Sequence, residues 1–210
     1  MKRMTMAILA SLLALATGAS ATTQATGTNT VAPKMNMTVN IQKAVSLTLK
    51  TGNAAVAHCA VTGAGGGADY NMDFGTVDAL GINGGNCNKI NPANPGVDNA
   101  IYWSDYQITP VFTSHTASSG TTVTAQVTTD FGGSHNVFVV RDALNSSTVP
   151  AAATDFTAMG VASADSIGGG SITNGAALTR FIGVAVKPDN NATVLQGSQT
   201  ATVTFTLTVQ

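Results

Sequence analysis

The amino-acid sequence predicts an all-β protein, an antiparallel β-sandwich, from three observations. Residues 200–210 alternate without a break between polar and apolar side chains, which is the period of a strand with one buried face. All ten acidic residues are aspartate and the chain holds 22 glycines, so a common helix former is absent and turn residues are abundant. Apolar runs are separated by clusters rich in Gly and Asn, a spacing typical of sandwiches rather than of parallel α/β folds.

Residues 1–21 are expected to be a signal peptide. Lys2 and Arg3 form a basic start, and residues 7–16 are an apolar stretch too short to cross a bilayer. The small residues at positions 19–21 form a cleavage site, so maturation is expected at Thr22. We therefore expect an exported, secreted chain without a transmembrane segment.

Residues 22–42 are expected to be an N-terminal extension, ahead of a sandwich domain that spans residues 43–210. The extension carries an alternating apolar stripe, and the same period continues after Lys43 as far as Leu49. The stripe is made of Met35, Met37, Val39 and Ile41. Fifteen extended residues would span about 50 Å, more than twice a usual strand. Either the chain bends near Lys43, or the part before Lys43 projects beyond the domain.

Further strands are predicted from apolar alternation and β-branched residues at 54–61, 72–77, 101–112, 122–128, 136–141 and 180–186. Residues 145–175 are rich in Ala, Ser, Gly and Thr, and they predict a long surface loop with a short strand or a helical turn. The last strand buries one face, which consists of Ala201, Val203, Phe205, Leu207 and Val209.

Cys59 and Cys87 are the two cysteines of the chain, and an oxidising compartment predicts a disulfide between them. On the chain-entropy model such a bridge stabilises the fold by roughly 3 to 4 kcal/mol. A metal site is the alternative, but His58 beside Cys59 is not completed by a CxxC or HxxxH motif. We expect no metal centre and no cofactor.

The charge balance restricts the partners of the chain. Charged residues make up 9% of it, and its formal net charge of −1 becomes −3 once Lys2 and Arg3 are removed. This composition argues against a basic nucleic-acid footprint and against a polybasic membrane anchor.

Catalytic motifs are weak in this sequence, and we expect no enzyme activity. His58, His115 and His135 occur without a GxSxG or HExxH motif, although an aspartate pair for glycoside hydrolysis stays open. The start of a calcium loop is imitated at residues 69–73, but Leu80 stands where its last carboxylate belongs. Calcium binding is left open elsewhere, in the Asn- and Asp-rich stretch 88–105, although these residues are also common in turns.

Two adjacent aromatic residues in the strand at 101–112 point to opposite faces. Trp103 is expected in the core, while Tyr102 is expected to be exposed, where its ring could contact a ligand such as a sugar.

The end of the chain, Gly197 followed by the alternating strand, resembles the closing strand of chaperone-usher pilins and of spore-coat-U-type secreted fibre subunits. Phe74-Gly75 and residues 181–188 are faintly similar to the same families. The resemblance implies an incomplete immunoglobulin-like sandwich whose missing strand is donated by the next subunit. It also implies a homopolymer as partner, with a periplasmic chaperone and an outer-membrane usher as further candidates.

The sequence therefore predicts a structural subunit of a surface fibre, pilus or coat, located at the cell surface. Met35, Met37, Val39 and Ile41 would form the donor strand, and the apolar face of 201–209 would border the acceptor groove. Burying four such side chains is worth on the order of 10 kcal/mol. The alternatives are that residues 35–41 pair within their own sandwich, giving a secreted monomer, and that the chain is an adhesive or carbohydrate-binding module.

Overall fold

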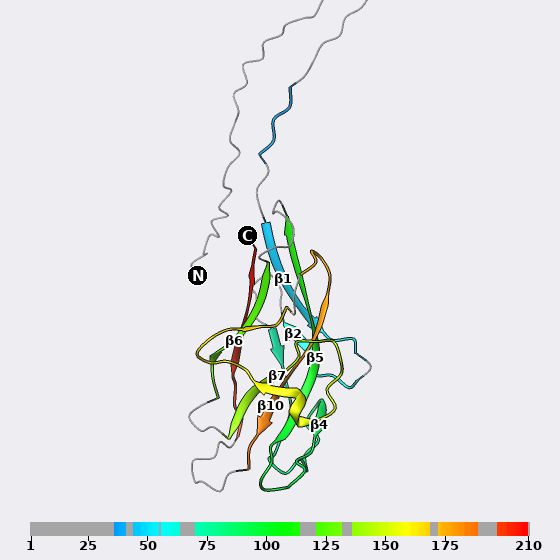
Figure 1. The fold of residues 1–210 in the computed structure, drawn as a ribbon, viewed down its shortest axis with the longest axis vertical. Helices are drawn as coiled ribbons and strands as arrows, with labels where there is room; N and C mark the ends of the chain where they lie inside the picture. The colour runs from blue at the N-terminus through cyan, green and yellow to red at the C-terminus, as the bar shows by residue number, and fades with distance from the viewer. Residues whose placement is uncertain are drawn as a thin grey trace, which may run out of the picture. The chain divides into compact units, whose positions relative to one another are not determined.

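A computed structural model describes residues 36–40, 44–54, 56–63, 70–113, 121–131, 136–168, 172–188 and 197–209. The chain divides into two units, residues 1–40 and residues 41–210. The predicted signal peptide lies outside the described residues. The second unit is built from strands, together with one short 3-10 turn, η1 (Ala153–Asp155) (Figure 1). The prediction of an all-β, sandwich-like fold is confirmed.

The larger sheet has six strands, all paired antiparallel, and β5 (Ala100–Thr113) is its central strand. One edge of β5 pairs with β4 (Asn88–Ile90) and then with β1 (Ala44–Thr51). The other edge pairs with β10 (Leu178–Val186), which is followed by β7 (Val137–Asp142) and β8 (Phe156–Ala158). β4 pairs with the first residues of β5 and β1 with the last, so these two strands lie at opposite ends of the sandwich.

The smaller sheet has three strands in the order β11 (Thr202–Thr208), β6 (Thr122–Thr129) and β9 (Asp165–Ser166). A separate hairpin is formed by β2 (Val61–Gly63) and β3 (Tyr70–Met72). Gly197 shortly before β11 adopts a φ of 75°, a left-handed conformation that glycine reaches without steric cost. The sequence placed β5, β6, β7, β10 and β11 to within two residues.

Two predicted strands are wrong in their extent. The described residues of the first, 54 and 56–60, form no strand, and pairing begins at Val61. In the other segment the strand ends at Met72, and residues 73–77 are irregular. The main-chain N–H groups of Ala54 and Cys59 donate to side chains, as described below, and that of Val56 donates to the carbonyl of Ala54.

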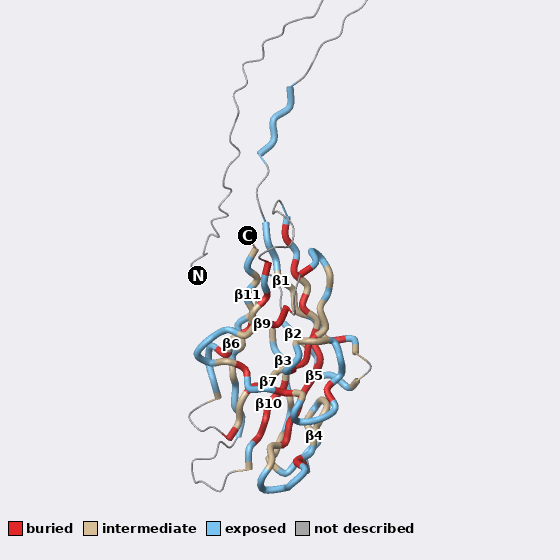
Figure 2. Tube along the Cα trace, viewed as in Figure 1, coloured by how far each residue is buried: buried red, intermediate tan, exposed pale blue. Residues whose placement is uncertain are grey.

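The main core lies between the two sheets. It contains Tyr106 and Ile108 from β5 with Val123, Ala125 and Val127 from β6. The opposite face of the large sheet is also covered, because Ile101 and Trp103 pack there with Phe181 and Phe156. Burial on both faces explains why residues 100–106 are buried without interruption, which Figure 2 shows along β5.

Candidate functional site

The candidate site is the seam between β1 and β11, the edge strands of the two sheets. Among the described residues β1 pairs with β5 alone and β11 with β6 alone. An edge strand presents a row of unpaired main-chain N–H and C=O groups, which is a template for a further strand. We call this region the open seam.

Partly buried apolar side chains line the open seam from both sides. From β1 they are Leu47 and Leu49, and from β11 and its flanks they are the predicted groove residues Ala201, Val203, Phe205, Leu207 and Val209. All pack against the main core and none is fully covered. The ring of Phe205 meets Tyr106 edge-on, with 5.5 Å between centroids. At the seam, apolar side chains that pack against the main core therefore remain partly exposed to solvent.

An open hollow of about 470 Å³ lies beside β1. It is bounded by residues of β1 and of the β2–β3 hairpin, namely Thr48, Leu49, Lys50, Thr51, Val61, Gly63 and Tyr70. The main-chain N–H of Val61 donates to Oγ1 of Thr51 at 2.9 Å, so the hairpin is fastened to the end of β1. This hollow shares Leu49 with the open seam, and its other lining residues belong to β1 and to the hairpin.

The opposite seam is closed by the chain itself, which crosses from β8 to β9. The N–H of Met159 donates to Val139 of the large sheet, while the N–H of Val127 in the small sheet donates to Gly160. Arg180 reaches across from β10, and its guanidinium donates to the carbonyls of Ile167 and Gly168 at 2.6 and 2.9 Å. One side of the sandwich is thus joined by hydrogen bonds between the two sheets, whereas β1 and β11 at the open seam are not paired with each other in the described part of the chain.

The predicted donor residues are partly described. Met37 and Val39 are 88% and 79% exposed, and residues 36–40 belong to no strand. Met35 and Ile41 lie outside the described residues. Two large apolar side chains that alternate along an extended segment are thus presented to solvent.

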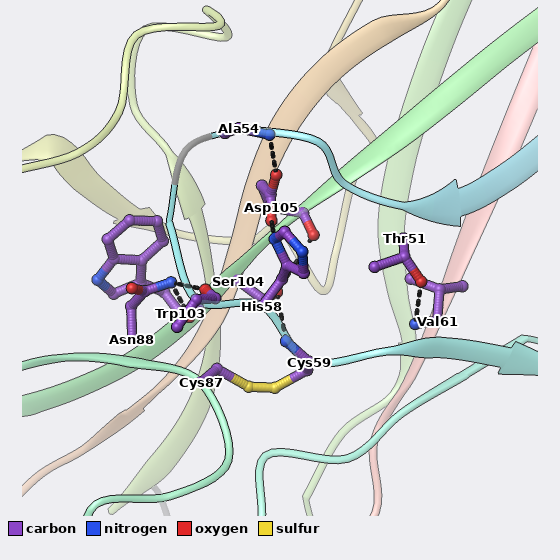
Figure 3. A network of polar contacts seen from close by, with 11 residues as sticks. Thr51, Ala54, His58, Cys59, Val61, Cys87, Asn88, Trp103, Ser104 and Asp105 are labelled. Atoms are coloured by element: carbon purple, nitrogen blue, oxygen red, sulfur yellow. Dashed lines mark hydrogen bonds and ion pairs between the residues drawn. A yellow bond between two sulfur atoms is a disulfide. The ribbon is translucent and has the colours of Figure 1, made fainter.

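A polar network fixes the segment 52–60 on the outer face of the large sheet (Figure 3). The fully buried carboxylate of Asp105 accepts the N–H of Ala54 at 2.7 Å and contacts Nδ1 of His58 at 3.0 Å. The N–H of Cys59 donates to Oγ of Ser104 at 2.9 Å, and the amide of Asn88 donates to the carbonyl of Ala57. These bonds replace the strand ladder that the sequence predicted for this segment.

The disulfide between Cys59 and Cys87 is confirmed, with 5.1 Å between the two Cα atoms. It ties the same covering segment to the residue before β4. Within the described chain, His58 contacts Asp105 and no hydroxyl or thiol, so this pair holds the segment in place. The other two histidines singled out by the sequence lie outside the described residues.

The prediction that Tyr102 is exposed is wrong. Its side chain is buried on the inner face of β5, and its hydroxyl donates to the carbonyls of Asp78 and Asn83 at 3.0 and 3.1 Å. Burial raises the pKa of this phenol, with a smaller contribution from the charge of Asp78. The physical reason is that β5 is covered on both faces, so alternation along it does not separate core from solvent. A ring so buried offers no face to a ligand.

No cluster of three or more His, Cys, Asp or Glu side chains suited to a metal ion occurs among the described residues. The same residues contain no helix long and apolar enough to cross a membrane. Comparisons of this chain with protein-family models, with curated proteins and with solved structures found no match.

Proposed function

We propose that this protein is a structural subunit that assembles with copies of itself by strand donation. The observation that carries the proposal is the open seam, where, among the described residues, two strand edges without a partner flank partly buried apolar side chains of the main core. A strand inserted there would pair its main chain with an edge and cover Leu49, Phe205 and Leu207. The sandwich would then be complete on both sides.

The donor in this proposal is the segment 35–41, with Met35, Met37, Val39 and Ile41 entering the seam. Its described apolar side chains are exposed in the single chain, where they gain nothing from the core. Insertion into a second copy is heterologous, because donor and acceptor surfaces differ. Such contacts propagate, which supports a fibre, pilus or coat at the cell surface, reached by export.

A pair of matched variants tests the donation. Met37→Asp combined with Val39→Asp puts charge on the apolar face of the segment, while Thr38→Asp combined with Asn40→Asp puts the same charge on the other face. The mature chain should form filaments visible by electron microscopy. The first variant should abolish them with the β circular dichroism retained, and the second should not. A wild-type chain that stays monomeric at all concentrations, or equal loss in both variants, would refute donation.

A further inference from the structure

The link between the proposed donor and its own domain is short. Ile41 is three residues before Ala44, where β1 begins, with Gln42 and Lys43 between them. Three extended residues span at most about 11 Å. If residues 35–41 occupy the seam of another copy, the start of β1 must therefore lie within about 11 Å of the place where the donor leaves that seam. This step rests on the proposed function.

The direction of the donated strand then decides the kind of assembly. β1 begins and β11 ends at the same end of the sandwich, here called the β1-start end (Figure 1). A donor leaving the seam at that end would bring two β1-start ends together, and each copy could donate to the other in a closed dimer. If the donor instead leaves the seam at the β4 end, the β1-start end of the donating copy lies against the β4 end of the accepting copy. The two surfaces differ, so each copy can contact one further copy at either end and the assembly continues. A filament requires this second arrangement.

The β4 end carries an exposed apolar tip. It consists of Leu80 and Ile82, before β4, and Val97 after it, and Ile82 is 76% exposed. We call these three residues the β4 tip. Three large apolar side chains are thus exposed on the two loops that flank one short strand.

The β4 tip is held in shape by hydrogen bonds. The carboxylate of Asp78 accepts the N–H groups of Leu80, Ile82 and Asn83 at 2.8, 3.1 and 2.6 Å. The ammonium group of Lys89 in β4 donates to the carbonyl of Gly81 at 2.6 Å. A surface ordered in advance loses less conformational freedom when it binds.

The β1-start end also carries exposed apolar side chains. Val45 and Val111 are both exposed there, and Val111 lies on the outer face, opposite Ser46 in the register of β1 and β5. We propose that the β4 tip is a second contact between successive copies of this chain, made with the β1-start end of the donating copy around Val111. This contact adds to the donated strand and sets the two domains directly against each other.

The test uses the mature full chain and the concentration above which filaments form. Ile82→Asp should raise that concentration at least tenfold. Leu144→Asp is the matched control, because Leu144 is also 76% exposed but lies after β7, away from both ends, and it should leave the concentration unchanged. Val111→Asp should weaken assembly as Ile82→Asp does, and Ile82→Asp combined with Val111→Lys should recover it.

Two readings separate this contact from strand donation. Hydrogen exchange of residues 36–40 reports the donated strand, and it should slow in assembled wild-type protein. Slowed exchange together with an unchanged threshold for Ile82→Asp would overturn the β4 tip contact and leave donation standing. Wild-type protein without slowed exchange and without filaments would overturn both. Circular dichroism of each variant checks that it is folded.

Discussion

At the scale of single residues, the aspartates share one role. Each of the eight aspartates in the described part of the chain accepts at least one main-chain N–H. They are Asp73, Asp78, Asp98, Asp105, Asp130, Asp142, Asp155 and Asp165. A short carboxylate reaches N–H groups a few residues away, whereas the longer side chain of glutamate loses more freedom in doing so. In the described loops, aspartate carboxylates hold the main chain in place. Glutamate would be less suited to this role, which is a physical reason for the use of aspartate alone.

Asp78 should make stability depend on pH. Its burial alone would raise its pKa, but the N–H groups of Asn83, Ile82 and Leu80 together hold the pKa below its usual value. Because the folded state favours the ionised form, the stabilisation is complete above about pH 4 and is lost as pH falls through the lowered pKa. Asp78→Asn should cost about 1 kcal/mol at neutral pH and much less at about pH 2, measured by urea unfolding.

A control for this prediction is Asp130→Asn, because Asp130 accepts one N–H, that of its neighbour Phe131. This variant should unfold like the wild type at both pH values. Asp142 acts in the opposite direction, since burial raises its pKa despite the N–H groups of Ser146 and Phe181. The ionised form of Asp142 is costly in the folded state, so its protonation at acid pH offsets part of the stability that the protein loses through Asp78.

A steeper pH dependence of stability in Asp78→Asn than in wild type would contradict the role given to Asp78.

Gly52 is required by the buried carboxylate of Asp105. A Cβ atom at position 52 would overlap that carboxyl group, which is itself held by Ala54 and His58. Gly52→Ala should therefore destabilise the fold by about 2 to 3 kcal/mol, measured by thermal or urea unfolding. Gly84→Ala is the control, because nothing lies within 4 Å of the position of its Cβ, and it should change stability by less than about 0.5 kcal/mol. Equal effects would show that Asp105 can move away.

At the scale of elements, the two seams of the sandwich differ in how they are held. The closed seam has main-chain hydrogen bonds from both sheets to the β8–β9 connection, and it has the buried side chain of Arg180. Arg141 adds an ion pair to Asp165 at 3.3 Å. At the open seam, β1 pairs with β5 and β11 with β6, and no strand pairing between β1 and β11 occurs among the described residues. A partner strand can therefore be added on one side without breaking existing bonds.

Arg180→Met tests the importance of the closed seam. The substitution keeps an unbranched apolar stem but leaves the carbonyls of Ile167, Gly168 and Thr179 without the donors they have at 2.6 to 2.9 Å. The loss should be about 3 to 5 kcal/mol, measured by urea unfolding. Lys187→Met, an equivalent loss of charge at an exposed position just after β10, should be nearly neutral. Similar effects of the two substitutions would show that the hydrogen bonds of Arg180 do not stabilise the closed seam.

Local pattern predicts the long strands of this fold well and the covering layer poorly. Alternating β-branched residues located β6 and β11, because each has one face with exposed polar side chains, and an apolar run located β10, which is buried on both faces. The segment 54–60 was also predicted as a strand, yet main-chain N–H groups of this segment donate to Asp105 and Ser104, about fifty residues further along the chain. The signal available in the sequence was Asp105, a charged residue within the predicted strand 101–112. A carboxylate in a buried strand needs a hydrogen-bond donor, which indicates that another segment covers this face. Long-range partners of this kind are not encoded in local periodicity.

At the scale of the whole molecule, the sequence predicted the terminal strand, the disulfide and the β11 side of the seam, but not that β1 forms its other side. The seam follows from which strands become edges, and sheet order depends on pairing between distant segments. The prediction for Tyr102 failed for the same reason, because the second covering layer could not be foreseen from β5 alone. The apolar face of β11 was predictable because its period is short and complete.

Assembly by strand donation predicts that stability depends on protein concentration. A partner that binds the folded form raises the unfolding temperature by mass action. The melting temperature of the mature chain should therefore rise with concentration, as measured by differential scanning calorimetry. The Met37→Asp and Val39→Asp double variant should melt at a temperature independent of concentration. A wild-type chain that behaves like this variant would contradict strand donation.

Trp103 gives the outer layer its own optical reporter. It is the single tryptophan of the chain, and its indole packs with Phe156 and Phe181 on the face of the large sheet that points away from the open seam. Its fluorescence emission will therefore shift to longer wavelength when the covering layer detaches, and not when a strand enters or leaves the seam. Loosening of the cover and exchange between subunits can thus be followed separately in one sample.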